Sequence, residues 1–189
     1  MFPNKMEEQL VLALMQMQWD RAEADGYAEH MTTDPYPNTP AHQVLMHAAF
    51  GDFQVSNFAA EVEARTVGAR IMDSSLMPGR NWEIHPFFGL TPMPRDSSGA
   101  ILPWDGSALV FWDVGNLPPP NANIPPSTQG GDPHGDPRKT LKGIDQKVIF
   151  WLTGQVADVM NGGPYLACVP GEESQIPRVP SQFTFDWCR

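Results

Sequence analysis

The sequence lacks any apolar run approaching the eighteen or more residues that a membrane-spanning helix needs. Its first residues also lack the basic, apolar and small-residue pattern of a secretion signal, so it carries no export address. Positive charge is scarce, because 12 Lys and Arg residues stand against 22 Asp and Glu residues and leave a net charge of -10. Nucleic-acid backbones and anionic membrane surfaces would repel such a chain. We therefore expect neither a transmembrane segment nor a nucleic-acid partner.

Cysteine is nearly absent as well. Cys168 and Cys188 lie in a tail of turns and short apolar groups. A local disulfide between them would compensate for a thin core. The alternative is that both are buried free thiols, and the sequence leaves both possibilities open. A disulfide would imply an oxidising compartment, which conflicts with the missing export signal. From that conflict we expect a longer protein whose beginning precedes Met1.

Length and composition favour one loop-rich domain over residues 1–189. A chain of 189 residues with 41% hydrophobic content can bury a sizeable core. The 20 prolines and 16 glycines are concentrated in connections, which is typical of a globular chain with long loops rather than of a disordered one.

Hydrophobic spacing predicts three helices, over residues 6–17, 57–67 and 138–160. The residues at three- and four-residue spacing, which we expect to face the core, are Met6, Leu10, Leu14 and Met17 in the first helix, Ala59, Val62 and Thr66 in the second, and Leu141, Ile144, Val148, Leu152, Val156 and Val159 in the third.

Two continuous apolar runs, residues 43–49 and 108–114, predict buried parallel strands. Residues 20–40 are rich in turn formers and should hold no regular structure. Residues 69–103 form a long excursion, which we expect to lie outside the sheet as a surface cover or lid. The fold class is therefore α/β, a partial parallel sheet flanked by helices with long Pro-rich loops, and two strands leave that sheet short of partners.

Two candidate catalytic residues follow the predicted strands. Asp52 comes after the first strand, and His134 lies in a turn-rich loop between the second strand and the last helix. Because parallel strands end at one edge of a sheet, the two fit the acid and the base of a nucleophile-His-acid triad. Asp52 could instead be a helix cap, and His134 a surface turn or a weak metal ligand. No second spaced His or Cys pair accompanies His134, so we expect no metal and no cofactor, and we expect His47 to be a hydrogen-bonded core histidine.

Five short segments together carry a resemblance to a known family. They are residues 19–28, 38–42, 48–55 (AAFGDFQV), 64–69 (ARTVGA) and 132–138 (DPHGDPR). They resemble the C-terminal half of bacterial α/β-hydrolases of the secreted esterase and lipase kind, over most of residues 6–169. The resemblance implies that Asp52 is the triad acid and His134 the triad base, with a small ester or a lipid as substrate. It also implies a secreted or periplasmic protein if Cys168 pairs with Cys188.

The sequence departs from that family because it contains no Gly-x-Ser-x-Gly nucleophile elbow. Ser107 begins a predicted strand, and Ser74, Ser75, Ser97 and Ser98 lie in predicted turns, none of them between a strand and a helix. Two interpretations stay open. The chain supplies the acid and the His of an esterase completed by an N-terminal half in trans, or it is an inactive truncated hydrolase that acts as a binding or assembly module. In the second case it could be a homo-oligomer whose subunits complete each other's sheet.

Overall fold

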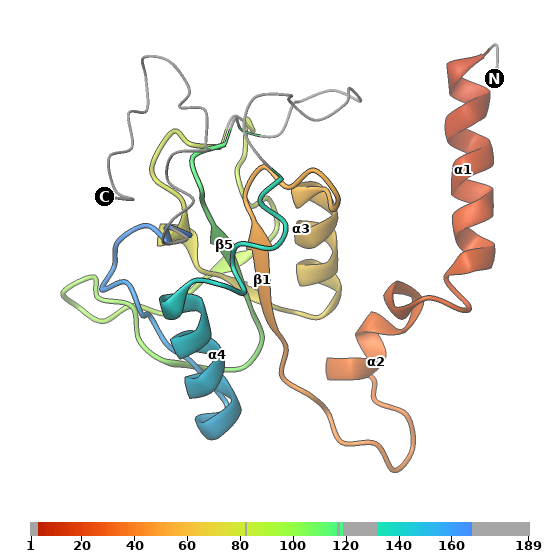
Figure 1. Ribbon diagram of the computed structural model, residues 1–189. Helices are drawn as coiled ribbons and strands as arrows, with labels where there is room; N and C mark the ends of the chain where they lie inside the picture. The colour runs from red at the N-terminus through yellow and green to blue at the C-terminus, as the bar shows by residue number, and fades with distance from the viewer. Residues whose placement is uncertain (1–3, 82, 117, 119–131, 168–189) are drawn as a thin grey trace. The chain divides into compact units, whose positions relative to one another are not determined.

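The computed structural model describes residues 4–81, 83–116, 118 and 132–167 (Figure 1). The chain divides into two compact units, Met1–His42 and Gln43–Arg189, and each is described by itself. The single domain over residues 1–189 stays a prediction. Cys168 and Cys188 lie outside the described residues, so the structure does not test whether they form a disulfide.

The first unit consists of helix α1 (Lys5–Trp19), the 3-10 helix η1 (Ala24–Tyr27) and helix α2 (Ala28–Thr32). The prediction of α1 is confirmed, and the Asn4 side chain caps it by accepting a hydrogen bond from the Met6 amide at 3.0 Å. The prediction that residues 20–40 hold no regular structure is wrong. Turn formers flank α2, but the residues between them favour a helix, and Ala28 is fully buried.

The apolar stripe of α1 does not form a core. Its members are 54% to 80% exposed: Met6, Leu10, Leu14 and Met17. The prediction of a core face is therefore wrong for this unit. The physical reason is that η1 and α2 are too short to provide a second apolar layer along a 15-residue helix.

The second unit is built on a four-stranded parallel sheet with the order β1-β5-β2-β3. Its strands are β1 (Leu45–Ala49), β2 (Arg70–Ile71), β3 (Thr91–Pro92) and β5 (Ala108–Trp112). The long strands β1 and β5 confirm the positions of the two predicted strands, but only β5 is buried throughout, whereas four of the five residues of β1 are partly exposed. The prediction that residues 69–103 lie outside the sheet is wrong, because β2 and β3 come from that segment. Strands of two residues are too short to give an alternation signal in the sequence.

Helices α3 (Asn57–Thr66) and α4 (Leu141–Thr153) flank the sheet, with β1 and β5 between them in Figure 1. On one face of β5, Trp112 packs edge-on against Tyr165 at 5.0 Å between ring centroids. On the other face, Phe111 contacts the rings of Phe50 and Phe87. This arrangement is an α/β fold with a mainly parallel sheet, as predicted. None of the helices in the described residues is long and apolar enough to cross a membrane.

The predicted position of helix α3 in the chain is confirmed, but the prediction of which residues face the core is wrong. The buried residues of α3 are Asn57, Glu61 and Ala64, whereas Ala59, Val62 and Thr66 are exposed. Two of the three buried residues are polar, so a search for apolar spacing could not find this face. Helix α3 begins after Ser56, whose side chain makes no capping hydrogen bond.

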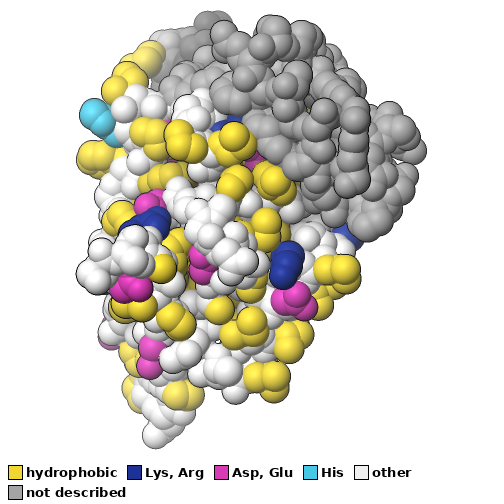
Figure 2. Space-filling model, turned by 90° about the vertical axis from the view of Figure 1, so that its left-hand side faces the viewer, with side chains coloured by type: hydrophobic (Ala, Val, Ile, Leu, Met, Phe, Trp, Pro, Cys, Tyr) yellow, Lys and Arg dark blue, Asp and Glu magenta, His cyan; other side chains and the backbone are white. Residues whose placement is uncertain are grey.

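Helix α4 is shorter than predicted, and the face that it buries is not the predicted one. It ends at Gly154, which adopts a left-handed φ of 72° and donates its amide to the Phe150 carbonyl. The chain then enters β6 (Gln155–Val156), which pairs antiparallel with β4 (Trp104–Asp105). Four of the predicted core residues are exposed, namely Leu141, Ile144, Val148 and Leu152, and Gly143 and Gln146 are buried in the helix instead. The other two, Val156 and Val159, lie beyond the helix, where Val156 is buried in the core and Val159 packs against it. Figure 2 views the molecule from the left-hand side of Figure 1 and shows many apolar side chains on this surface.

Candidate active site

Asp52 lies just beyond the carboxyl end of β1, in a turn that the sequence builds with a glycine and an asparagine. Gly51 has a φ of 76°, a left-handed conformation that a residue with a Cβ rarely adopts. The buried Asn57 side chain donates to the Ala49 carbonyl at 2.7 Å and accepts the Gly51 amide at 2.8 Å. These two hydrogen bonds tie the start of α3 to the end of β1 and fix the turn that precedes Asp52.

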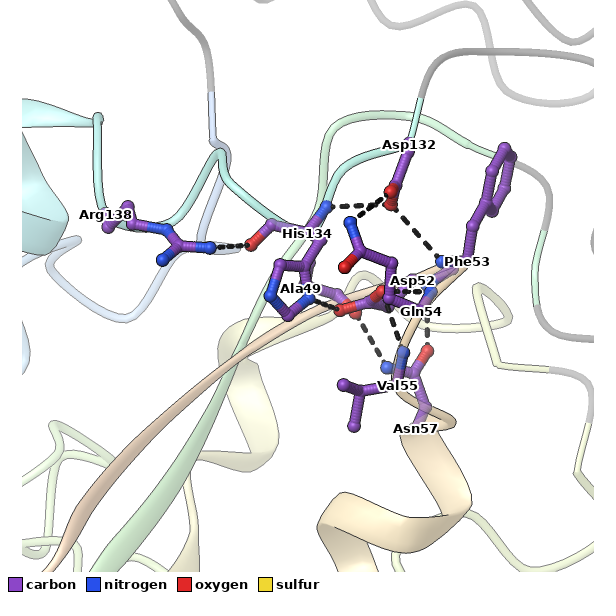
Figure 3. Close-up of polar contacts among 10 residues, drawn as sticks. Ala49, Asp52, Phe53, Gln54, Val55, Asn57, Asp132, His134 and Arg138 are labelled. Atoms are coloured by element: carbon purple, nitrogen blue, oxygen red, sulfur yellow. Dashed lines mark hydrogen bonds and ion pairs between the residues drawn. The ribbon is translucent and has the colours of Figure 1, made fainter.

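The two carboxylate oxygens of Asp52 have different partners (Figure 3). Its Oδ1 accepts the backbone amides of Gln54 at 2.7 Å and Val55 at 3.1 Å, which closes the turn before α3. Its Oδ2 lies 2.8 Å from Nδ1 of His134. The structure thus brings together the two candidate residues that the sequence indicates, across 82 positions of the chain. Asp52 also closes its own turn, but it does not cap α3, whose N-cap residue is Ser56, so the helix-cap alternative is wrong.

The exposure of the two side chains differs in the way that general base catalysis requires. The Asp52 side chain is 7% exposed, whereas the His134 side chain is 33% exposed. Because an ionised carboxylate can only accept hydrogen bonds, Nδ1 of His134 carries the proton in this contact. The lone pair is then on Nε2, which makes no hydrogen bond to any described residue. The pair could therefore take a proton from an incoming group at Nε2.

The loop that carries His134 is held at both of its ends. The Asp132 carboxylate accepts the His134 amide at 3.1 Å, and the Asp136 amide donates to the Pro133 carbonyl at 2.9 Å. Further on, helix α4 approaches the loop closely at Gly143. A Cβ at Gly143 would lie 2.4 Å from the Pro137 carbonyl oxygen, so only glycine allows this approach.

No described serine bonds to His134. Ser107 lies at the amino end of β5, opposite to the edge where Asp52 lies, and its hydroxyl accepts the Val44 amide. Ser74 and Ser75 do lie at the carboxyl edge, in the 3-10 helix η2 (Asp73–Ser75) that follows β2. The sequence analysis missed that placement because β2 was not predicted. Ser75 bonds the Phe111 amide, and the buried Ser74 hydroxyl has no partner in the described part of the chain.

The carboxyl end of β5 holds a buried ion pair that the sequence analysis also missed. The Arg80 guanidinium bonds both carboxylate oxygens of Asp113, at 2.6 and 2.9 Å, and it donates to the Asn116 carbonyl. Both side chains of the pair are 1% exposed. The signal that could have found it is similar to the one that found Asp52, an Asp close to the end of a continuous apolar run.

His47 is hydrogen-bonded, as predicted, but it is only partly buried and does not belong to the fully buried core. It lies in the middle of β1, and its Nε2 contacts the Gln146 side-chain oxygen at 2.8 Å. Burial lowers the pKa of His47 from 6.5 to about 4, against the opposing effect of the Gln146 hydrogen bond. The imidazole therefore stays neutral at physiological pH and is structural.

One group of side chains among the described residues has metal-like spacing, and it lies in the first unit. Ligand atoms of Glu29, His30 and Asp34 all fall within 4.8 Å of one another. The imidazole, however, faces Glu29 with Nε2 and Asp34 with Nδ1. A single metal ion cannot use both ring nitrogens, so this geometry fits a histidine between two carboxylates better than a metal centre.

Comparisons with protein families, with curated proteins and with solved structures found no significant match for the chain.

Proposed function

We propose that this chain supplies the acid and the base of a carboxylic-ester hydrolase of the α/β-hydrolase esterase and lipase type. The observation that carries the proposal is the 2.8 Å contact between Asp52 Oδ2 and His134 Nδ1, with Nε2 left without a described partner. The position of Asp52 after a strand of a parallel sheet supports it. The substrate is a small ester or a lipid ester.

In the proposed mechanism, His134 Nε2 takes the proton of a serine hydroxyl as the serine oxygen attacks the ester carbonyl carbon. Asp52 holds the ring through Nδ1 and stabilises the imidazolium that forms. His134 then donates the proton to the leaving alcohol. In the second half of the reaction, His134 takes a proton from water, which attacks the acyl-serine, and returns it to the serine oxygen.

The serine in this mechanism comes from outside the described residues. Among the strands of the main sheet, β1 lies at one end of the order, so a further parallel strand could pair beside it. Such a strand would end at the same edge as β1 and could bring a nucleophile close to Asp52 and His134. We propose an N-terminal half in trans as its source, with a second copy of this chain as the alternative.

The experiment is hydrolysis of short-chain p-nitrophenyl esters by the purified chain, beside Asp52→Ala and His134→Ala. The control is His85→Ala, which removes an exposed histidine elsewhere in the chain. If a second copy of this chain supplies the serine, kcat should fall about 10²- to 10⁴-fold in the first two variants and stay unchanged in the control. A parent protein with no turnover and no labelling by a fluorophosphonate probe would rule out catalysis by the chain alone.

The second candidate is an inactive hydrolase fragment that acts as a binding or assembly module. It is favoured by the lack of any described serine bonded to His134 and by the edge position of β1. The solution mass and the unfolding transition distinguish the candidates. A compact monomer that unfolds cooperatively would argue against a fragment that needs a partner's strands.

A further inference from the structure

Asp132 connects the loop of His134 to the turn of Asp52 (Figure 3). Its Oδ1 accepts two backbone amides, that of His134 at 3.1 Å and that of Phe53 at 3.4 Å. Its Oδ2 accepts the side-chain amide of Gln54 at 2.6 Å. The Asp132 carboxylate thus binds the chain on both sides of the contact between Asp52 and His134. On one side it binds Phe53 and Gln54, which follow Asp52, and on the other side it binds the backbone amide of His134.

This arrangement matters because the two loops come from distant parts of the chain. The hydrogen bond from His134 to Asp52 fixes the tautomer only while the two loops keep the right distance from each other. A proton-transfer site needs its side chains held within about 0.5 Å of the productive position, usually by hydrogen bonds from a surrounding layer of residues. The bonds from Phe53 and Gln54 to Asp132 restrict the distance between the loops independently of the imidazole.

The charge of Asp132 suits the same role. Asp132 is exposed, and the slight loss of solvent around its carboxylate acts to raise its pKa, but the hydrogen bonds from Gln54, His134 and Phe53 outweigh that effect and lower the pKa. The side chain is therefore an acceptor of all three bonds at neutral pH. It also attracts the His134 ring when that ring is protonated.

We propose that Asp132 and Gln54 form a positioning clamp that holds His134 against Asp52 with Nε2 free to accept a proton. The clamp rests on the proposed function, since it matters only if His134 acts as a base. Neither residue touches the reacting atoms. Asp132→Asn keeps an oxygen for the two backbone amides, and the Gln54 amide can turn its oxygen toward the new NH₂ group. Asp132→Ala removes all three bonds.

The experiment measures the tautomer of the His134 imidazole by ¹⁵N NMR on the full chain, together with hydrogen exchange of the Phe53 amide. In the parent we expect one tautomer, with the proton on Nδ1. We expect Asp132→Ala and Gln54→Ala to give a mixture of tautomers, and Asp132→Ala to speed Phe53 exchange several-fold. Asp132→Asn should keep the parent tautomer.

Asp96→Ala is the matched control. Asp96 also accepts the amide two residues on, that of Ser98 at 2.8 Å, but it bonds only within its own turn. Its removal should leave the His134 tautomer unchanged. A parent tautomer that persists in both Asp132→Ala and Gln54→Ala would overturn the clamp, and if Asp132→Ala does not fold, the exposed Gln54 decides alone. Because the readout does not depend on turnover, an inactive parent would rule out catalysis by the chain alone without deciding the clamp.

Discussion

The buried pair of Arg80 and Asp113 predicts a large loss of stability in Asp113→Ala. The substitution would remove the Asp113 carboxylate from the Arg80 side chain, which is 1% exposed, and would take from the Gly115 amide the acceptor that it meets at 2.8 Å. Removing one partner of a buried ion pair costs roughly 3–5 kcal/mol. Since small domains are stable by only about 5–15 kcal/mol, we expect a variant close to unfolding.

The control for that prediction is the ion pair of Arg95 and Asp73. It is also an Arg–Asp pair, in which one guanidinium nitrogen donates to both carboxylate oxygens at 2.9 and 3.0 Å, but its side chains are 35% and 33% exposed. Water replaces such a partner readily, so Asp73→Ala should cost about 1 kcal/mol or less. The assay is urea unfolding followed by circular dichroism, with the free energy of unfolding compared between the two variants. Equal losses in the two variants would refute the argument that burial decides the cost.

Two further predictions concern the stability of the sheet and of the loop that follows it. Folding lowers the pKa of His47 from 6.5 to about 4. As the pH falls below 6.5, His47 therefore takes up a proton in the unfolded chain but not in the folded chain. Stability should therefore be full above pH 6.5 and fall by roughly 2 kcal/mol by pH 4.5, and urea unfolding of His47→Gln should show a correspondingly smaller pH dependence. Gly143→Ala should destabilise by about 1–3 kcal/mol in the same assay, although alanine favours helices, because its Cβ would displace the Pro137 carbonyl. A more stable Gly143→Ala would contradict that close approach.

The sequence predicted the parts of the fold that depend on continuous apolar runs. Strand β5 is buried at all five positions, so its run of apolar residues is a direct signal. The helix faces were not predictable in this way, because their buried positions carry Asn57 and Glu61 in α3 and Gln146 in α4. Each of these polar residues has a specific hydrogen-bond or ion-pair partner in the fold. Such pairs cannot be recognised from the spacing of residues in a sequence.

The candidate site was predictable to the extent that it follows from topology. Asp52 follows a parallel strand and His134 precedes a helix, and the order of the two along the chain indicated that they would meet. Asp132 could not be recognised as a connecting residue, because its role depends on the distance between two loops. An aspartate two residues before a histidine is ordinary in a sequence, and only the bonds to Phe53 and Gln54 distinguish it from a residue that caps its own turn.

A single proposed partner would account for both the exposed apolar residues of α4 and the edge position of β1. Leu141, Trp151 and Leu152 are 73% to 80% exposed, which removes little apolar surface from water and gives these side chains no stabilising role in the second unit. An edge strand likewise offers backbone groups to a further strand. Both features lie in the unit that holds Asp52 and His134. A partner that covers them would bury apolar surface and extend the sheet at the same time, so completion of the fold and completion of the proposed active site would be one event.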